Sequence, residues 1–318
     1  MNEYRKMGLG TAAIGRPHYI NIKQEKAEEF NLEKFKESGM KLLESTYQQG
    51  IRYFDTAPGY GIAEQLLIEW LKGKNDSSIE VATKWGYTYR ANFDPNAKVH
   101  EVKDHGIDQL DRQWKNSRAL LPFLSTLQIH SATLDSGVLK NQEVLDRLAE
   151  LKEEFGIKIG ITTTGDNQVE VIKQAMNVTA NGSPLFEVYQ VTYNILDQSL
   201  ATISQELNSM GRRIVIKEAM ANGRLFQNLQ YPHYADLYNT LSHLATKYGF
   251  GIDALALRFC IDTLNPFKVL SGGAKDSHVQ QNLKANDFSL EKADLELLKS
   301  FEVNTKDYWA ERKQLQWN

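Results

Sequence analysis

The chain has 318 residues, of which 42% are hydrophobic and 24% are charged. Its 37 Lys plus Arg against 40 Asp plus Glu give a formal net charge of −3, which excludes the strongly basic balance of a nucleic-acid-binding protein. The single cysteine, Cys260, excludes an intrachain disulfide, and the sequence shows neither a secretion signal nor eighteen consecutive apolar residues. We therefore expect a cytoplasmic globular protein that acts on a small molecule, without a nucleic acid or membrane partner.

Short apolar segments rich in strand-forming residues recur along the chain. They cover residues 7–11, 52–55, 79–84, 124–129, 157–161, 187–191, 213–217 and 267–271. The stretches between them have the periodicity of amphipathic helices; in residues 141–155, for example, Val144, Leu148 and Leu151 share one face. Eight strands alternating with helices predict an α/β fold of the (β/α)8 barrel type, and we expect one domain over residues 1–318.

An open dinucleotide-binding sheet is the alternative architecture. The segment GLGTAAIG at 8–15 has glycines after the first strand, but it lacks the GxGxxG spacing, so we favour the barrel. Three connections, 12–31, 86–106 and 219–235, are longer than usual, and loops of this length in compact domains are often functional. The first and third are expected to form a ligand-facing rim. The aromatic tail after about residue 302 either packs on the barrel or reaches its mouth.

Titratable residues follow three neighbouring strands of the predicted barrel. Asp55, Lys84 and His130 stand at strand ends, and Tyr60 lies in the turn after Asp55. Taken singly, each residue could have a purely structural role in capping, in the solvent or in the core. Because the carboxyl ends of barrel strands face the active site, a common catalytic role is the better interpretation. Such a set can deliver a proton to a carbonyl oxygen. We expect the Lys84 ammonium to lower the pKa of Tyr60, Asp55 to hold Lys84, and His130 to orient the carbonyl.

Several motifs follow one another in order along nearly the whole chain. They are GIRYFDTAPGYG with Glu64 following, ATKWG, QIHSA, QVTYN and a glycine-rich loop ahead of Asn282. With these motifs the chain resembles the aldo-keto reductases. The resemblance implies that Asp55, Tyr60, Lys84 and His130 are the catalytic residues, with Tyr60 as the acid, and that a nicotinamide cofactor supplies the hydride.

The resemblance also implies a site for the nicotinamide end of the cofactor. Gln190 matches the residue that hydrogen-bonds the carboxamide, and Thr162 replaces the serine that is usual beside it. The next residue, commonly asparagine in the family, is Thr163 here, which weakens one of the amide contacts.

The stretch VLSGGAKDSHVQQNL after the last strand is the predicted site for the phosphate end. Gly272 and Gly273 let backbone amides approach an anion at the start of a helix, although a plain tight turn is the alternative. By resemblance, Gln281 and Asn282 contact the adenine end. Only Lys275 and His278 are available for a 2′-phosphate, so NADP(H) is the first choice of cofactor and NAD(H) is not excluded.

The strand at 213–217 departs from the family at its end. Lys217 stands where many relatives have a tyrosine that stacks on the nicotinamide. We expect Lys217 to pair with Glu218 or another acid, or to reach a phosphate or the substrate, and we expect Arg224 on the following loop to contact the pyrophosphate.

The leading hypothesis is therefore an oxidoreductase for carbonyl or alcohol substrates, with a sugar or polyol as the weakly indicated class. Trp85 and Tyr19 are the candidate substrate-binding residues, against the alternative that such aromatics belong to the core, and no metal site is predicted. Two other classes stay open. One is a non-catalytic, cofactor-sensing barrel that resembles the β subunits of potassium channels, and the other is a non-redox enzyme on the same scaffold.

Overall fold

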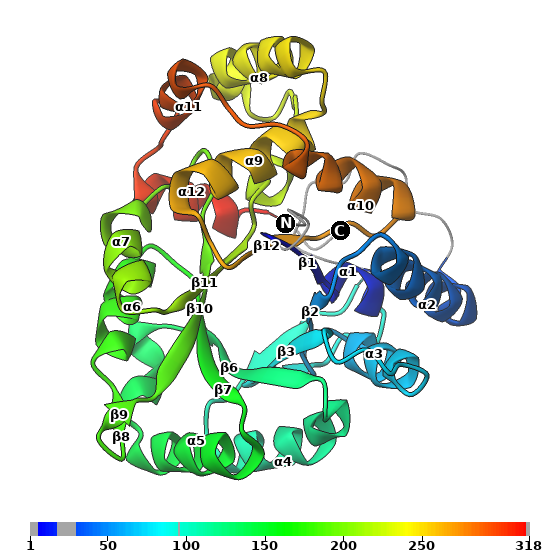
Figure 1. The fold of residues 1–318 in the computed structure, drawn as a ribbon, viewed down its shortest axis with the longest axis vertical. Coiled ribbons are helices and arrows are strands. Elements are labelled where there is room, and N and C mark those ends of the chain that lie inside the picture. Colours follow the sequence, from blue (N-terminus) through cyan, green and yellow to red (C-terminus); the bar gives the residue numbers. More distant parts are fainter. Residues whose placement is uncertain (1–5, 18–29, 95, 316–318) are drawn as a thin grey trace.

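The computed structural model describes residues 6–17, 30–94 and 96–315. Eight parallel strands close into a barrel in the order β1-β12-β11-β10-β7-β6-β3-β2 (Figure 1). Their bounds are β1 Met7–Gly10, β2 Tyr53–Asp55, β3 Glu80–Trp85, β6 Leu124–Ala132, β7 Lys158–Thr163, β10 Phe186–Thr192, β11 Arg213–Lys217 and β12 Lys268–Ser271. Each strand overlaps a segment that the sequence predicts to be a strand, and the predicted (β/α)8 barrel is confirmed.

Helices surround the barrel (Figure 1). They are α1 Ala12–Gly15, α2 Leu32–Gln48, α3 Ala63–Leu71, α4 Ile107–Ser117, α5 Gln142–Phe155, α6 Gln168–Met176, α7 Ala201–Ser209, α8 Ala235–Tyr248, α9 Ile252–Leu264, α10 Asp276–Leu283, α11 Lys292–Lys299 and α12 Thr305–Lys313. Short 3-10 turns join several of them. Within the described ranges, no helix has both the length and the apolar character that a membrane crossing requires.

Helix α5 illustrates how the local sequence sets these elements. The Asn141 side chain accepts a hydrogen bond from the Val144 amide at 3.4 Å and caps the helix at its start. Gly156 ends it in the left-handed conformation, with φ 65°. The predicted apolar face is buried in the core, so this connection was read correctly from its periodicity.

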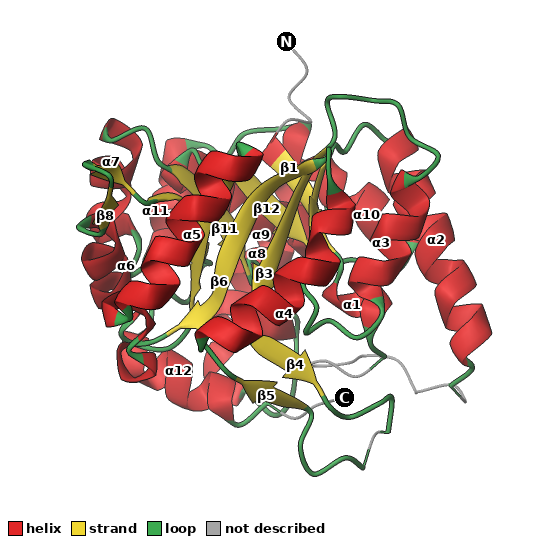
Figure 2. Ribbon diagram, turned by 90° about the horizontal axis from the view of Figure 1, so that it is seen from below, coloured by secondary structure: helices red, strands yellow, loops and turns green. Residues whose placement is uncertain are grey.

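The long connection at 86–106 contains a hairpin that the sequence did not indicate. Strands β4 (Tyr87–Tyr89) and β5 (Glu101–Lys103) pair antiparallel outside the barrel, with Tyr89 opposite Glu101. A second small hairpin, β8 (Thr179–Ala180) with β9 (Ser183–Pro184), lies elsewhere. Figure 2 shows the β4–β5 hairpin and α12 at the end of the barrel toward which β6 points, the end where barrel enzymes carry their sites.

The tail both packs on the barrel and reaches its mouth. Tyr308 and Trp309 of α12 are buried, the Trp309 indole donates to Asp197 at 3.1 Å, and the Tyr308 hydroxyl accepts from Asn194 at 2.9 Å. These contacts dock the helix, and Arg312 one turn further lines the pocket described below. The two alternatives for the tail are therefore both realised.

Candidate active site

The Asp55–Lys84 ion pair forms the floor of the site. Asp55 ends β2, Lys84 stands in the neighbouring β3, and their side chains are 2% and 0% exposed. Lys84 Nζ donates to Asp55 Oδ2 and, at 3.0 Å, to the Thr56 carbonyl. Asp55 Oδ1 accepts from the amides of Gln128 at 3.2 Å and Gln190 at 2.6 Å. Because both charges have partners, this buried pair is held in one geometry.

Tyr60 and His130 lie directly above this floor. The Lys84 Nζ is 4.6 Å from the centroid of the Tyr60 ring, and the His130 ring lies edge-on to Tyr60 with centroids 5.4 Å apart. The structure thus brings together all four residues that the sequence singles out. Tyr60 and His130 line a pocket, while Asp55 and Lys84 lie beneath it.

The pKa values of these two rings follow from burial. Burial raises the pKa of Tyr60 well above its ordinary value of 10.0, Asp55 raises it further, and Arg16 lowers it. The expected lowering of the Tyr60 pKa is therefore not found in this structure, because burial and the Asp55 carboxylate outweigh the cations nearby. Burial also lowers the pKa of His130 well below 6.5, so the imidazole is neutral at pH 7 and can donate from one nitrogen.

His105 is a supporting residue that sequence reasoning missed. Its Nε2 lies 2.9 Å from the His130 carbonyl oxygen, and its ring packs edge-on to Trp85 with centroids 5.5 Å apart. Gly86 makes room for it, because a Cβ at this position, where φ is 110°, would lie 2.3 Å from the His105 ring. Burial lowers the pKa of His105 to about 4, so this contact does not depend on a charged ring. The glycine after KW was the only sequence signal.

The two predicted substrate-binding aromatics have different outcomes. Trp85 is 1% exposed, belongs to the hydrophobic core and does not line the pocket, so its prediction is wrong. The reason is strand alternation: Lys84 points into the barrel, and its neighbour in β3 therefore points outward. Tyr19 lies outside the described residues.

Thr162 and Gln190 form a pair on the opposite wall of the pocket. They are direct neighbours in the register of β7 and β10, and both line the pocket. The Thr162 hydroxyl accepts from the Ser131 amide at 2.7 Å, which leaves its own proton free to be donated into the pocket. The Gln190 nitrogen donates to Asp55, which leaves its carbonyl end as an acceptor. Thr163, by contrast, is buried, and its hydroxyl has no hydrogen-bond partner among the described residues.

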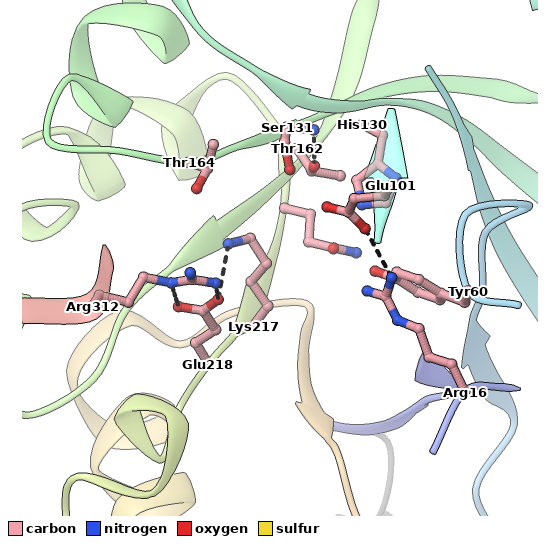
Figure 3. Close-up of a pocket in the computed structure, with 11 residues that line it drawn as sticks. Arg16, Tyr60, Glu101, His130, Ser131, Thr162, Thr164, Lys217, Glu218 and Arg312 are labelled. Atoms are coloured by element: carbon pink, nitrogen blue, oxygen red, sulfur yellow. Dashed lines mark hydrogen bonds and ion pairs between the residues drawn. The ribbon is translucent and has the colours of Figure 1, made fainter. Parts of the chain in front are cut away.

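A charged cluster closes the far side of the pocket (Figure 3). Glu218 accepts from Arg312 Nη2 at 2.6 Å and from Arg312 Nε at 3.2 Å. Lys217 Nζ donates to the Thr192 hydroxyl at 2.8 Å and lies 3.9 Å from Glu218, so the expected pairing of these neighbours is present but loose. Burial raises the pKa of Glu218, but Lys217 and Arg312 outweigh it and bring the value to about 2.

The backbone is left-handed at two places beside this pocket. Ser131 has φ 52° and Glu218 has φ 56°, and both residues line the pocket. Such conformations cost energy for residues other than glycine and persist where surrounding contacts hold them. Here the Ser131 amide is held by Thr162, and the Glu218 carbonyl accepts from the Asn194 amide at 3.0 Å.

The hairpin and the first connection meet across the pocket mouth. Arg16 Nη1 donates to Glu101 of β5 at 2.8 Å and to the Gly59 carbonyl at 3.2 Å. Its guanidinium carbon also lies 5.4 Å from the Tyr60 ring centroid. Arg16 was expected on a rim, whereas Glu101 was not foreseen, because nothing in the sequence shows that the hairpin folds toward the barrel.

The residues predicted for the phosphate and adenine ends lie on the turn before α10 and along that helix. A Cβ at Gly272 would meet open space, so the backbone there is accessible from outside, whereas one at Gly273 would lie 3.0 Å from His278. Lys275, His278 and Gln281 are exposed. Asn282 is buried beside Ser271, with its side-chain amide 2.7 Å from the Ser271 hydroxyl.

Arg224 does not line the pocket. It is fully buried, and its guanidinium donates to Glu311 at 2.8 Å and to the carbonyls of Tyr308 and Ala221. These contacts fasten the loop after β11 to α12. Among the described residues, only the Nη2 of Arg224 lacks a hydrogen-bond partner within this guanidinium. The predicted contact with a pyrophosphate would have to use this nitrogen, or the guanidinium would have to leave its present partners.

Comparison with known proteins gives this site its context. The model of the Aldo/keto reductase family matches residues 6–303. L-galactose dehydrogenase of Arabidopsis thaliana is 25% identical, with 76% of each chain covered. The NADH-specific methylglyoxal reductase of Escherichia coli is 23% identical over 92% of this chain and 93% of its own. A solved aldo/keto reductase from Klebsiella pneumoniae, in complex with NADP and acetate, superposes with a TM-score of 0.67 at 19% identity, covering 93% and 90%.

Proposed function

Because the chain belongs to the aldo-keto reductase family of NAD(P)H-dependent oxidoreductases, we propose that it transfers a hydride between a nicotinamide dinucleotide and a carbonyl or alcohol substrate. One observation carries the proposal: Tyr60 and His130 line the same pocket as the Thr162–Gln190 pair. The Tyr60 phenol, a proton donor, therefore lies in the same pocket as a donor and an acceptor that match the cofactor's carboxamide. A sugar or polyol is the proposed substrate class.

The Thr162–Gln190 pair fits a carboxamide. The free hydroxyl proton of Thr162 can be donated to the amide oxygen, and the carbonyl end of Gln190 can accept from the amide nitrogen. The bound nicotinamide supplies or accepts the hydride, which no side chain can do. The two residues would hold this carboxamide at the pocket that Tyr60 and His130 also line.

Tyr60 is the proposed general acid. Its raised pKa means that the phenol keeps its proton at neutral pH and can give it to a carbonyl oxygen as negative charge develops there. The neutral His130 donates a hydrogen bond that positions the same oxygen. Lys84, held by Asp55 close to the Tyr60 ring, stabilises the phenolate that proton donation leaves.

Replacing the phenol tests this assignment. Tyr60→Phe removes the proton donor and preserves the ring, so nicotinamide-dependent turnover should fall by about 10²-fold or more. Cofactor affinity, measured by quenching of tryptophan fluorescence, should be retained. The matched control is Tyr189→Phe, which removes a buried hydroxyl without a hydrogen-bond partner among the described residues, away from the pocket. If Tyr60→Phe keeps most of its activity, Tyr60 is not the acid.

The same assay separates the alternatives. A cofactor-sensing barrel, like the potassium-channel β subunits that one branch of the family resembles, would bind the dinucleotide tightly and turn over no carbonyl. A non-redox enzyme would form product without a change in nicotinamide absorbance. Either result would contradict the proposed hydride transfer.

The choice of cofactor has its own test. NADP(H) remains the first choice, with NAD(H) as the alternative, and Lys275 is an exposed lysine on the turn that contains Gly272. If Lys275 meets the 2′-phosphate, Lys275→Ala should weaken NADPH binding by roughly 1–2 kcal/mol and leave NADH nearly unchanged. Equal weakening of both would place Lys275 on another part of the cofactor. Dissociation constants from fluorescence titration distinguish the two results.

A further inference from the structure

The pocket wall is unusually polar for a site that receives small carbonyl compounds. Apart from the ring of Tyr60, its described lining residues are all polar or charged. They are Arg16, Glu101, His130, Ser131, Thr162, Thr164, Gln190, Lys217, Glu218 and Arg312. Since small-molecule sites are mostly apolar with a few placed polar groups, this wall indicates a substrate with polar groups beyond its carbonyl.

The charges on this wall do not cancel within the described part of the chain. Three cationic side chains, Arg16, Lys217 and Arg312, face two carboxylates, those of Glu101 and Glu218. The Asp55–Lys84 pair beneath them is neutral as a unit. The lining side chains therefore carry one excess positive charge. Asp197 also acts electrostatically on Lys217, but it does not line the pocket and already accepts from Gln168, Ser199 and Trp309.

Contact distances identify where this excess charge lies. Glu101 is in direct contact with Arg16 at 2.8 Å, and Glu218 accepts twice from Arg312. Lys217 is 3.9 Å from Glu218, which is too far for a hydrogen bond, and its close contact at 2.8 Å is the neutral hydroxyl of Thr192. An ammonium has three donors, so the half-buried Lys217 can still take an anionic partner.

We propose that the Lys217 ammonium binds a carboxylate of the substrate, so that the enzyme reduces oxo acids or oxidises the corresponding hydroxy acids. The proposal rests on the hydride transfer proposed above and names the substrate class of that same pocket. Buried charges are stabilised by pairing, and a substrate carboxylate would complete the pairing of this wall. It would also fix the carbonyl relative to Tyr60, which lines the same pocket. Such a substrate remains compatible with a sugar or polyol backbone, as in a sugar acid.

A second anion could use the same ammonium: the pyrophosphate of the cofactor. The position of Lys217 favours the substrate, because it shares the pocket with both Tyr60 and His130, and its charge contributes to the lowered pKa of His130. The two sources are distinguished by measuring cofactor affinity and carboxylate affinity separately in the same variants.

The first arm of the test is selectivity between matched aldehydes. Succinic semialdehyde and butanal differ by a carboxylate in place of a methyl group. The wild-type enzyme should have a kcat/KM for succinic semialdehyde about tenfold or more above that for butanal, and Lys217→Met should lower the first about tenfold more than the second. Lys217→Arg should keep the preference. Lys173→Met, which removes an exposed lysine on α6, is the control.

The second arm needs no turnover. Butyrate, a carboxylate that cannot be reduced here, is titrated calorimetrically into the protein with NADPH present, and Lys217→Met should weaken its binding about tenfold. NADPH affinity should not change. Absence of Lys217-dependent butyrate binding overturns the proposal, as does weakened NADPH binding with butyrate unaffected, which would place the ammonium on the pyrophosphate. If neither aldehyde is turned over while butyrate binding depends on Lys217, the hydride transfer fails and the carboxylate site stands.

Discussion

The floor and the mouth of the pocket are built in different ways. The floor consists of Asp55, Lys84, Gln128 and Gln190, all on barrel strands, and the carboxylate of Asp55 receives donors from each of the other three. The mouth, taken together with the far side, consists of the Arg16–Glu101 and Glu218–Arg312 pairs, whose partners are 85 and 94 residues apart and come from the connections, the hairpin and α12. Floor geometry therefore follows from barrel closure, whereas mouth geometry requires outer segments to dock.

This difference predicts a division of labour. Residues of the floor are buried and bonded to one another, so substitutions there should affect both folding and chemistry. Residues of the mouth contact substrate-facing space, so substitutions there should alter selectivity and affinity with smaller losses of stability. Three experiments test this comparison, beginning with the one of largest expected effect.

Lys84→Met should be the most damaging. It leaves the Asp55 carboxylate buried without its charged partner, which costs about 3–5 kcal/mol of unfolding free energy, and turnover should fall with it. Urea denaturation measures the loss. The double variant Asp55→Leu/Lys84→Met removes both charges and should recover part of the stability without recovering turnover. A loss below about 1 kcal/mol in the single variant would show that the floor is more tolerant than barrel closure implies.

Glu218→Gln should have an intermediate, pH-dependent effect. The native pKa of Glu218, about 2, lies below its ordinary value of 4.5, so the ionised carboxylate stabilises the fold above about pH 4.5, and this contribution is lost as the pH falls toward 2. At pH 7 the variant should be less stable by about 1–3 kcal/mol, and the difference from wild type should shrink below pH 4.5. Thermal unfolding at a series of pH values follows it. A difference that does not depend on pH would mean that Glu218 acts through packing.

The Arg16–Glu101 pair should give the smallest effect. Glu101 is 24% exposed, so solvent weakens the pair, and a double-mutant cycle of Arg16→Met and Glu101→Gln should yield a coupling of about 0.2–1 kcal/mol. The Michaelis constant should change in these variants, because the Arg16 guanidinium lies beside the Tyr60 ring. A coupling energy above about 3 kcal/mol would show that this pair contributes as much to stability as the buried Asp55–Lys84 pair.

The Asp55–Lys84 pair of the floor and the two rings above it could be predicted from the sequence because each of these residues lies near the end of a strand or in the turn that follows one. The strand-end positions of Asp55, Lys84 and His130, together with the turn at Tyr60, are enough to place four side chains at one end of a barrel. The alternation of side chains along a strand also predicts that Trp85, next to Lys84, points away from the pocket. The error on the pKa of Tyr60 has a different origin, since the balance between burial and the Asp55–Lys84 pair depends on packing that the sequence does not display.

The mouth was largely beyond sequence reasoning. Glu101 and Arg312 lie in segments without a motif, and only docking of the hairpin and α12 brings them to the pocket. Lys217 could be singled out because it departs from a family pattern, but the closer contact of Glu218 is with Arg312, which lies far along the chain. Ion pairs between distant surface segments have no periodic signature comparable to that of a strand or helix.

The position of α12 near the end of the chain bears on the order in which the parts of the site are synthesised. A ribosome releases the amino end first, so all eight strands, the last of which ends at Ser271, emerge well before Arg312. Until that arginine arrives, Glu218 lacks its closest hydrogen-bond donors, although the cations of Lys217 and Arg224 are already part of the chain. All eight strands of the barrel are thus available before the charged wall beside Lys217 can be completed by α12.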